Sequence, residues 1–189
     1  MIALILLSAV GCSNGSGSDG SGAPEGTTAD TSVTENGDTE ETAAPDIPEA
    51  TVGGVVFSLS QDGEFFDLLY KYPDNMEYEK NENAEGDIFK YLSDGYDPYA
   101  FAIEVTRTDE YSPEEVISGI LRISPTITSA DCNGISWTVG SDLIDESKGI
   151  LYACSLGGYT YLVQFATKYA GSFDFDELAE VFIQNVTAK

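Results

Sequence analysis

One nucleophile pattern is present near the start of the chain. Gly11-Cys12-Ser13-Asn14-Gly15 has the Gly-x-Ser-x-Gly spacing of a serine nucleophile carried on a strand-to-helix turn. Such a serine needs a histidine to accept its proton, and the sequence contains no histidine. Histidine is also the commonest zinc ligand, so its absence makes a zinc site less expected. We therefore predict no catalytic residue, no metal site and no cofactor, and we expect the protein not to be an enzyme.

One cluster of acidic residues could still act on a substrate. Asp174, Asp176 and Glu177 lie close together in the sequence. Carboxylates also stabilise the positive N-terminal end of a helix, and this role explains the group better. Paired carboxylates of a glycosidase would need a cleft and a set separation. A carboxylate-dependent hydrolase of wall or glycan material therefore stays an alternative.

The chemistry of Cys12 is suggested by the residues before it. Ile2–Val10 is apolar, too short to cross a bilayer, and has the length of the apolar region of a signal peptide. Ala9-Val10-Gly11-Cys12 resembles the lipobox of bacterial lipoproteins, with Ala9 where leucine is usual. This resemblance implies that residues 1–12 are a signal segment and that Cys12 carries fatty acyl chains such as palmitate. Two chains would anchor the protein stably to the lipid bilayer, on the extracytoplasmic face of the cell membrane.

Residues 13–50 have the composition of a linker. Serine, glycine, threonine, alanine, proline and acidic residues dominate, and only Val33 and Ile47 are large and apolar. A segment this poor in hydrophobic residues cannot offset the entropy that ordering would cost. We predict a disordered acidic linker that would span roughly 35 Å as a flexible coil.

The charge of the chain limits its partners. It contains 33 acidic and 8 basic residues, for a net charge of −25. Such a surface repels phosphate backbones, so we expect no nucleic-acid partner. It also disfavours docking onto anionic lipids, so the acyl chains on Cys12 would have to supply membrane attachment.

Two further cysteines could pair. Cys132 and Cys154 are expected on consecutive strands joined by a loop at 140–149. If the register places them opposite each other, a disulfide would contribute about 3 kcal/mol. Two free buried thiols are the alternative.

Tyrosine is the residue type most suggestive of recognition, because it offers apolar area and a polar tip at a low entropy cost. The chain has 11 tyrosines. The loop after the predicted strand at 87–92 contains Asp94, Tyr96, Asp97 and Tyr99, and we predict that these four residues bind a ligand. Trp137 lies in a predicted strand and is expected in the core.

Strands are predicted from short runs rich in β-branched and aromatic residues between turn residues. The runs cover residues 55–59, 65–72, 77–80, 87–92, 99–106, 126–130, 135–139, 150–155 and 159–167. Gln61-Asp62-Gly63 predicts a turn, and Gly157-Gly158 predicts a two-residue hairpin loop.

Two helices are predicted. Ser112, Pro113 and Glu115 form the start signal of the first, since the serine can cap the helix and the glutamate can return a hydrogen bond. The second is expected to be capped by Asp174, with Glu177 at the third position. Its apolar stripe has helical spacing and comprises Phe175, Leu178, Ala179, Phe182, Ile183 and Val186.

These elements predict the α+β class, as one domain over residues 51–189 with a mainly antiparallel sheet, one mid-chain helix and one C-terminal helix. Their order, with Tyr70-Lys71-Tyr72-Pro73, Ser112-Pro113-Glu114-Glu115 and Gly-Ile-x-Trp at 134–137, resembles the PsbP-like α/β/α sandwich of Gram-positive bacterial lipoproteins. The family consists mostly of non-catalytic modules, and the resemblance transfers no site residue.

The resulting expectation is a membrane-anchored extracytoplasmic lipoprotein that acts as a non-enzymatic binding or accessory module of the cell envelope. Its partner would be a protein or a cell-wall ligand. Besides the hydrolase, a solute-binding component of a transporter remains an alternative, although a two-lobed clamp needs about twice the folded length.

Overall fold

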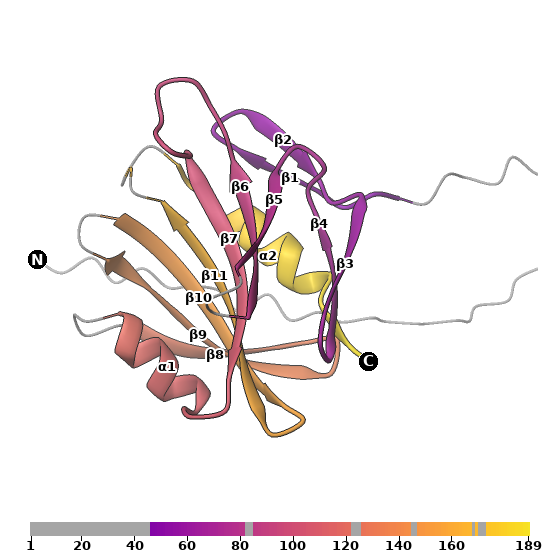
Figure 1. Cartoon of the computed structure of the whole chain (residues 1–189), viewed down its shortest axis with the longest axis vertical. Coiled ribbons are helices and arrows are strands. Elements are labelled where there is room, and N and C mark those ends of the chain that lie inside the picture. The colour runs from indigo at the N-terminus through magenta and orange to yellow at the C-terminus, as the bar shows by residue number, and fades with distance from the viewer. Residues whose placement is uncertain (1–45, 82–84, 122–125, 145–146, 168, 170–172) are drawn as a thin grey trace, which may run out of the picture. The chain divides into compact units, whose positions relative to one another are not determined.

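The fold is dominated by antiparallel β-structure (Figure 1). The computed structural model describes residues 46–81, 85–121, 126–144, 147–167, 169 and 173–189. Strands account for 56% and two short helices for 13% of it. The strands of the described part form one seven-stranded, one three-stranded and one two-stranded sheet.

The seven-stranded sheet forms the body of the molecule. Its strands in spatial order are β5 (Glu77–Asn81), β6 (Gly86–Tyr91), β7 (Phe101–Thr108), β11 (Tyr159–Thr167), β10 (Ser147–Leu156), β9 (Ile135–Ile144) and β8 (Thr126–Cys132). The hairpin predicted at Gly157-Gly158 is confirmed, since it joins β10 to β11 and both glycines have positive φ.

The remaining strands of the described part form two small sheets. The two-stranded sheet pairs β1 (Glu49–Val52) with β2 (Val55–Ser58). The three-stranded sheet has the order β12 (Thr187–Ala188), β4 (Leu68–Tyr72) and β3 (Gln61–Phe65). Because β1 begins at Glu49 and Ala50 is buried, paired structure starts two residues before the expected domain start at 51.

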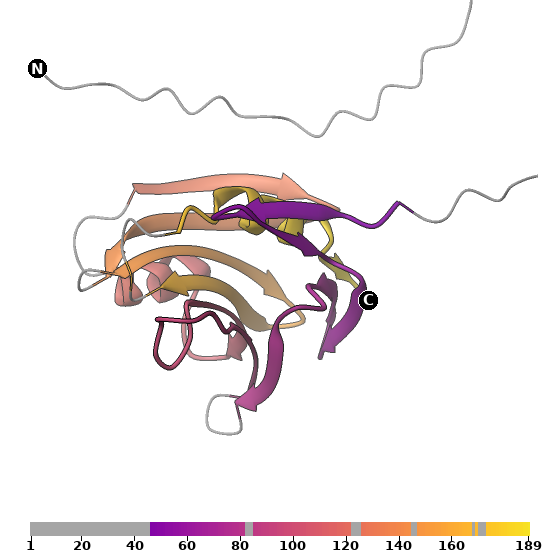
Figure 2. The ribbon, with the colours of Figure 1, turned by 90° about the horizontal axis from the view of Figure 1, so that it is seen from above.

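The face of the large sheet that carries Ile103, Val105 and Phe165 is called the inner face, and it holds most of the core. Alternate residues of a strand point to the same face, which explains why Phe101, Ile103 and Val105 of β7 are all fully buried here. Helix α2 (Asp176–Gln184) packs on this face, beside β1 (Figure 2). Trp137 also lies in this core with 1% exposure, as predicted.

The opposite, outer face is covered by helix α1 (Pro113–Ile120), which contacts β9, β10 and β11. A second, smaller core lies between them and comprises Ile117, Leu121, Leu151, Ala153 and Leu162. The helix spans only eight residues, so it covers part of the sheet.

The assignment to the α+β class as a PsbP-like sandwich is wrong. Strands account for 56% and helices for 13% of the described part, which is mostly antiparallel β-structure. The physical reason is length, because helices of eight and nine residues cannot form layers over a seven-stranded sheet. Small sheets instead supply much of the inner core through residues such as Phe57 and Leu68.

The predicted single strand at 65–72 is also wrong. Phe66 has a φ of 51°, a left-handed conformation that breaks the strand. The chain turns there, and β3 pairs with β4 as a hairpin. The turn predicted at Gln61-Asp62-Gly63 is consequently wrong, because these residues belong to β3. The Tyr70 ring packs directly over Gly63, where an added Cβ would lie 2.2 Å from Tyr70 Cε2.

The start of the mid-chain helix is confirmed, with Ser112 as the N-cap and a complete capping box to Glu115. The C-terminal helix is present, but Asp174 is not its N-cap. The N-cap is Phe175, which makes no side-chain capping bond, while Asp174 Oδ1 accepts a hydrogen bond from the Asp176 N–H at 3.2 Å. Glu177 Oε2 instead accepts a hydrogen bond from the Thr51 N–H at 3.2 Å and so ties α2 to β1.

Cys132 and Cys154 do not form the disulfide considered from the sequence. Cys132 is in β8 and Cys154 in β10, and β9 lies between these strands. Strands two positions apart are about 9.5 Å apart, beyond the Cα separation that a disulfide can bridge. Cys154 is buried, and burial raises the pKa of its thiol to about 12.

Candidate functional site

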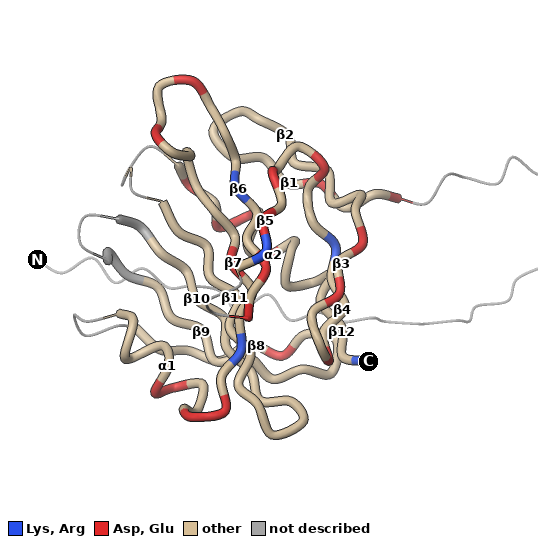
Figure 3. The backbone as a smooth tube through the Cα atoms, viewed as in Figure 1, with Lys and Arg blue, Asp and Glu red and all other residues tan. Residues whose placement is uncertain are grey.

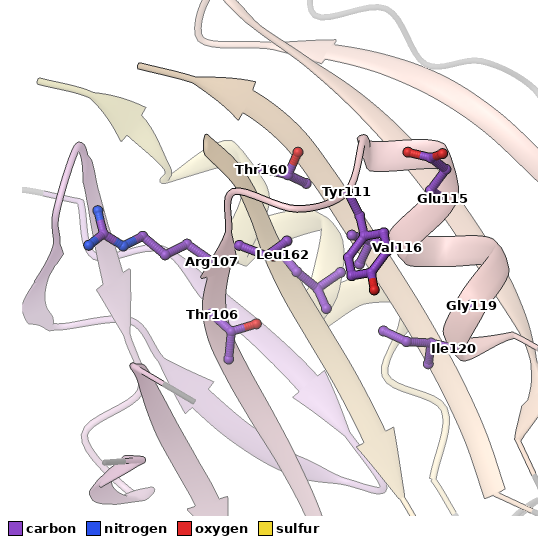
Figure 4. A pocket seen from close by; sticks show the side chains of 10 residues that line it. Thr106, Arg107, Tyr111, Glu115, Val116, Gly119, Ile120, Thr160 and Leu162 are labelled. Carbon is purple, nitrogen blue, oxygen red and sulfur yellow. The ribbon is translucent and has the colours of Figure 1, made fainter. Parts of the chain in front are cut away.

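A groove of about 510 Å³ lies where α1 meets the outer face of β7 and β11 (Figure 4). We call it the α1 groove and define it by its main lining residues, which are Thr106, Tyr111, Val116, Gly119, Ile120, Thr160 and Leu162. Its volume is in the range of small-molecule sites.

The floor of the groove is set by the pairing of two strands. β7 and β11 are antiparallel neighbours, and Leu162 lies opposite Thr106. The next residue pair on the same face is Thr160 and Thr108. Threonine hydroxyls and a leucine side chain therefore alternate on the floor, and Thr160 is only 5% exposed.

One wall of the groove is α1, whose first turn is fixed by its capping box. Ser112 Oγ accepts a hydrogen bond from the Glu115 N–H at 3.4 Å, and Glu115 Oε2 accepts from the Ser112 N–H at 2.9 Å. Tyr111 directly precedes this cap and is 55% exposed. Val116 and Ile120 follow at i and i+4, so both lie on one side of the helix, and Figure 4 shows Tyr111 and Val116 close to Leu162.

Two glycines shape the groove. Gly140 of β9 lets α1 approach the sheet, since an added Cβ would lie 2.4 Å from Ile117 Cγ2. Gly119 lies on α1 at the groove itself, and an added Cβ would meet no heavy atom within 4 Å. The missing side chain at 119 therefore leaves the groove open.

The charged residues at the rim are engaged elsewhere. Hydrogen bonds from the backbone and hydroxyl of Ser112 lower the pKa of the Glu115 carboxyl. The Arg107 side chain extends away from α1 in Figure 4, and its Cζ lies 4.4 Å from the Tyr159 ring centroid. The groove thus presents apolar side chains, hydroxyls and one tyrosine, a combination that suits a neutral and largely apolar ligand.

The loop predicted to bind a ligand lies elsewhere. It precedes Phe101, the first residue of β7, whereas the α1 groove lies at Thr106–Thr108, the other end of this strand. Eight strand residues span about 25 Å. The structure therefore does not bring the loop to the groove.

The two tyrosine rings of this loop contact other residues of the protein. Tyr96 is half-buried and packs against Tyr169, with ring centroids 4.6 Å apart. The Asp97 N–H donates a hydrogen bond to the Tyr169 hydroxyl at 2.9 Å. Tyr99 is half-buried, with Lys90 Nζ 5.8 Å from its ring centroid, and Asp94 is exposed. Binding by these four residues stays a prediction, and Cys12, the predicted lipid attachment site, lies outside the described residues.

Acidic residues are distributed widely along the described part of the backbone, and basic residues lie among them (Figure 3). Ion pairs between described residues include Lys71–Asp62, Lys90–Glu79, Arg107–Glu85 and Lys189–Glu64. Within the same ranges, no group of three or more side chains could hold a metal ion. None of the helices there has both the length and the apolar character required to span a bilayer.

The sequence predicted the start of α1 at Ser112 but no binding site beside this helix. The apolar positions Val116 and Ile120 and the exposed Tyr111 are signals in the sequence that could have pointed to the α1 groove. Thr106 and Thr160 carried no signal, because these polar residues meet only through the pairing of two strands about fifty residues apart. A search for alternating polar residues in the two strands could have identified them.

The sequence and fold were compared with known proteins. No protein-family model matches the chain, and no curated protein matches it. A crystal structure of a protein from Bacteroides thetaiotaomicron VPI-5482 is similar to it, with a TM-score of 0.46 and 12% sequence identity. The similarity covers 65% of this chain and 45% of that one, so the chain spans less than half the length of this structural relative.

Proposed function

We propose that this protein is a bacterial lipoprotein, anchored to the extracytoplasmic face of the membrane through acylated Cys12, and that its folded part is a non-enzymatic binding module. The α1 groove is its ligand site, and the ligand is a neutral, mainly apolar small molecule. The observation that carries this proposal is the groove itself, in which threonine hydroxyls and the exposed Tyr111 lie beside the side chains of Val116, Ile120 and Leu162.

The choice of ligand follows from size and charge. About 510 Å³ accommodates a small molecule. The net charge of −25 repels anions, and the carboxylate nearest to the groove, Glu115, already accepts hydrogen bonds from Ser112. The hydroxyls of Thr106 and Thr160 can each donate and accept, which suits a neutral polar group on an otherwise apolar ligand.

Lipid attachment is tested by metabolic labelling. We expect cells that express the full chain to incorporate a radioactive fatty acid into the protein. We expect Cys12→Ser to abolish the label, because the diacylglycerol is attached to the cysteine thiol and serine has no thiol. The measurement is the label in the purified protein, and the label-free variant should appear in the medium. Equal labelling of both proteins would contradict the anchor.

Ligand binding is tested at Gly119 by filling the groove. A helical side chain leans towards the preceding turn, so an indole at 119 would cover Glu115 and Val116. We expect Gly119→Trp to abolish binding of the neutral apolar dye Nile red, measured by its fluorescence increase on titration. Cys12→Ser protein serves as the parent, so that acyl chains do not bind the dye.

The matched control is Gly119→Ala. Its Cβ meets nothing within 4 Å, so Nile red binding should persist while the helix gains about 0.5–1 kcal/mol in free energy of unfolding. If the alanine and tryptophan variants bind the dye equally, the α1 groove is not the ligand site.

A further inference from the structure

A second groove, of about 520 Å³, lies between the β3–β4 hairpin, the edge strand β5 and its neighbour β6. We call it the Asp87 groove. The residues on which the argument depends are Glu64, Phe66, Tyr78, Lys80, Glu85 and Asp87. It combines two exposed aromatic rings with several charged side chains, unlike the α1 groove.

The two rings are exposed and held in place. Phe66 is 43% and Tyr78 is 53% exposed, which is high for aromatic residues. Phe66 lies at the hairpin turn, and the Arg107 guanidinium supports one side of its ring with Cζ 3.1 Å from the centroid. Tyr78 packs against Phe89, with centroids 5.5 Å apart. Both rings are therefore oriented before any ligand arrives, which lowers the entropy cost of stacking on them.

A buried carboxylate fixes the floor of this groove. Asp87 is only 6% exposed and accepts hydrogen bonds from the hydroxyls of Tyr70 and Tyr78, the latter at 2.9 Å. Burial and the hydrogen bond to Asp87 raise the pKa of both tyrosines, so both phenols keep their protons. The Asp87 bond thus holds the Tyr78 ring in one orientation.

The charges of this groove largely offset each other. Glu64 pairs with Lys189 at 2.5 Å, and Glu85 pairs with Arg107 at 3.3 Å. The glutamate oxygens that remain accessible can only accept hydrogen bonds, while the Lys80 ammonium can only donate them. A ligand matched to this lining has many hydroxyl donors, some acceptors and an apolar face for an aromatic ring.

We infer that the Asp87 groove binds a neutral carbohydrate, with the Tyr78 and Phe66 rings stacked on sugar C–H faces and the glutamates accepting hydroxyl hydrogen bonds. Sugars offer both kinds of surface on one molecule. Anionic glycans are disfavoured by the net charge of −25. This site is separate from the α1 groove, since the two share no lining residue.

The test uses the full chain with Cys12→Ser on an array of neutral oligosaccharides with gluco-, galacto-, manno- and N-acetylglucosamine units. We expect binding to at least one neutral glycan. Tyr78→Ala should then weaken binding at least about tenfold, because it removes a stacking ring; stacking of one nucleic-acid base on an aromatic ring is worth about this much or more. Tyr78→Phe keeps the ring but loses the hydrogen bond to Asp87, so it should bind more weakly than the parent and at least about threefold more tightly than Tyr78→Ala.

The matched control is Tyr111→Ala, which removes a tyrosine of nearly equal exposure from the α1 groove and should leave glycan binding unchanged. Failure to bind any neutral glycan, or an equal loss in the Tyr78 and Tyr111 variants, would overturn the inference. Circular dichroism confirms that each variant is folded. The Nile red titration is independent of this site, so either proposal can fail without the other.

Discussion

We expect Phe182→Ala to lower the free energy of unfolding by about 3–5 kcal/mol. Phe182 of α2 is fully buried on the inner face. Its ring contacts Tyr70 of β4 at a centroid distance of 5.6 Å and Phe165 of β11 at 5.7 Å. One side chain therefore connects the helix, the small sheet and the large sheet, and its removal leaves a cavity where the three meet.

An effect of this size would be a large part of the stability of a small domain, which is about 5–15 kcal/mol. The measurement is urea unfolding followed by circular dichroism. Tyr111→Ala is the control, because that tyrosine is 55% exposed and its loss should change stability by no more than about 0.5 kcal/mol. A loss below 1 kcal/mol for Phe182→Ala would show that α2 contributes little to the core.

The second large effect is expected at Gly140. A methyl group there would lie 2.4 Å from Ile117 Cγ2 and 2.9 Å from Leu121 Cδ1. Both partners are buried, at 0% and 1% exposure, so neither can move into solvent. We expect Gly140→Ala to cost about 1–3 kcal/mol through overpacking and to displace α1 from the sheet.

This displacement should also alter the α1 groove, since α1 forms one of its walls. Nile red titration of Gly140→Ala should therefore show weaker binding, together with a lower urea midpoint. Gly119→Ala again serves as the control, because it adds the same methyl group to α1 at a position where that group has no close contact. If both alanine variants were equally stable, the close approach of α1 to β9 would be refuted.

Local signals predicted local structure well. The capping box at Ser112 and the glycine pair at 157–158 each produced the expected element. Such signals depend on hydrogen bonds and backbone preferences within a few residues, so the sequence contains them in full.

Other elements depended on partners distant in sequence. β1 follows a polar stretch of the sequence, and it forms a strand because it pairs with β2 and packs against α2. β9 extends to Ile144 beyond its predicted end because β10 pairs with it over that length. The start of α2 differed from the prediction because Glu177 bonds to Thr51 rather than closing a capping box.

The sequence by itself determined the absence of histidine, the acidic charge, the start of α1 and the apolar stripe of α2. Only the tertiary structure decided the class of the fold, the separation of Cys132 from Cys154 by β9, and the two grooves. The physical reason is that composition and capping act within a few residues, whereas strand order is set by which faces can be buried together. Thr106 and Thr160 line one groove, and Phe66 and Tyr78 line the other, only once that order exists.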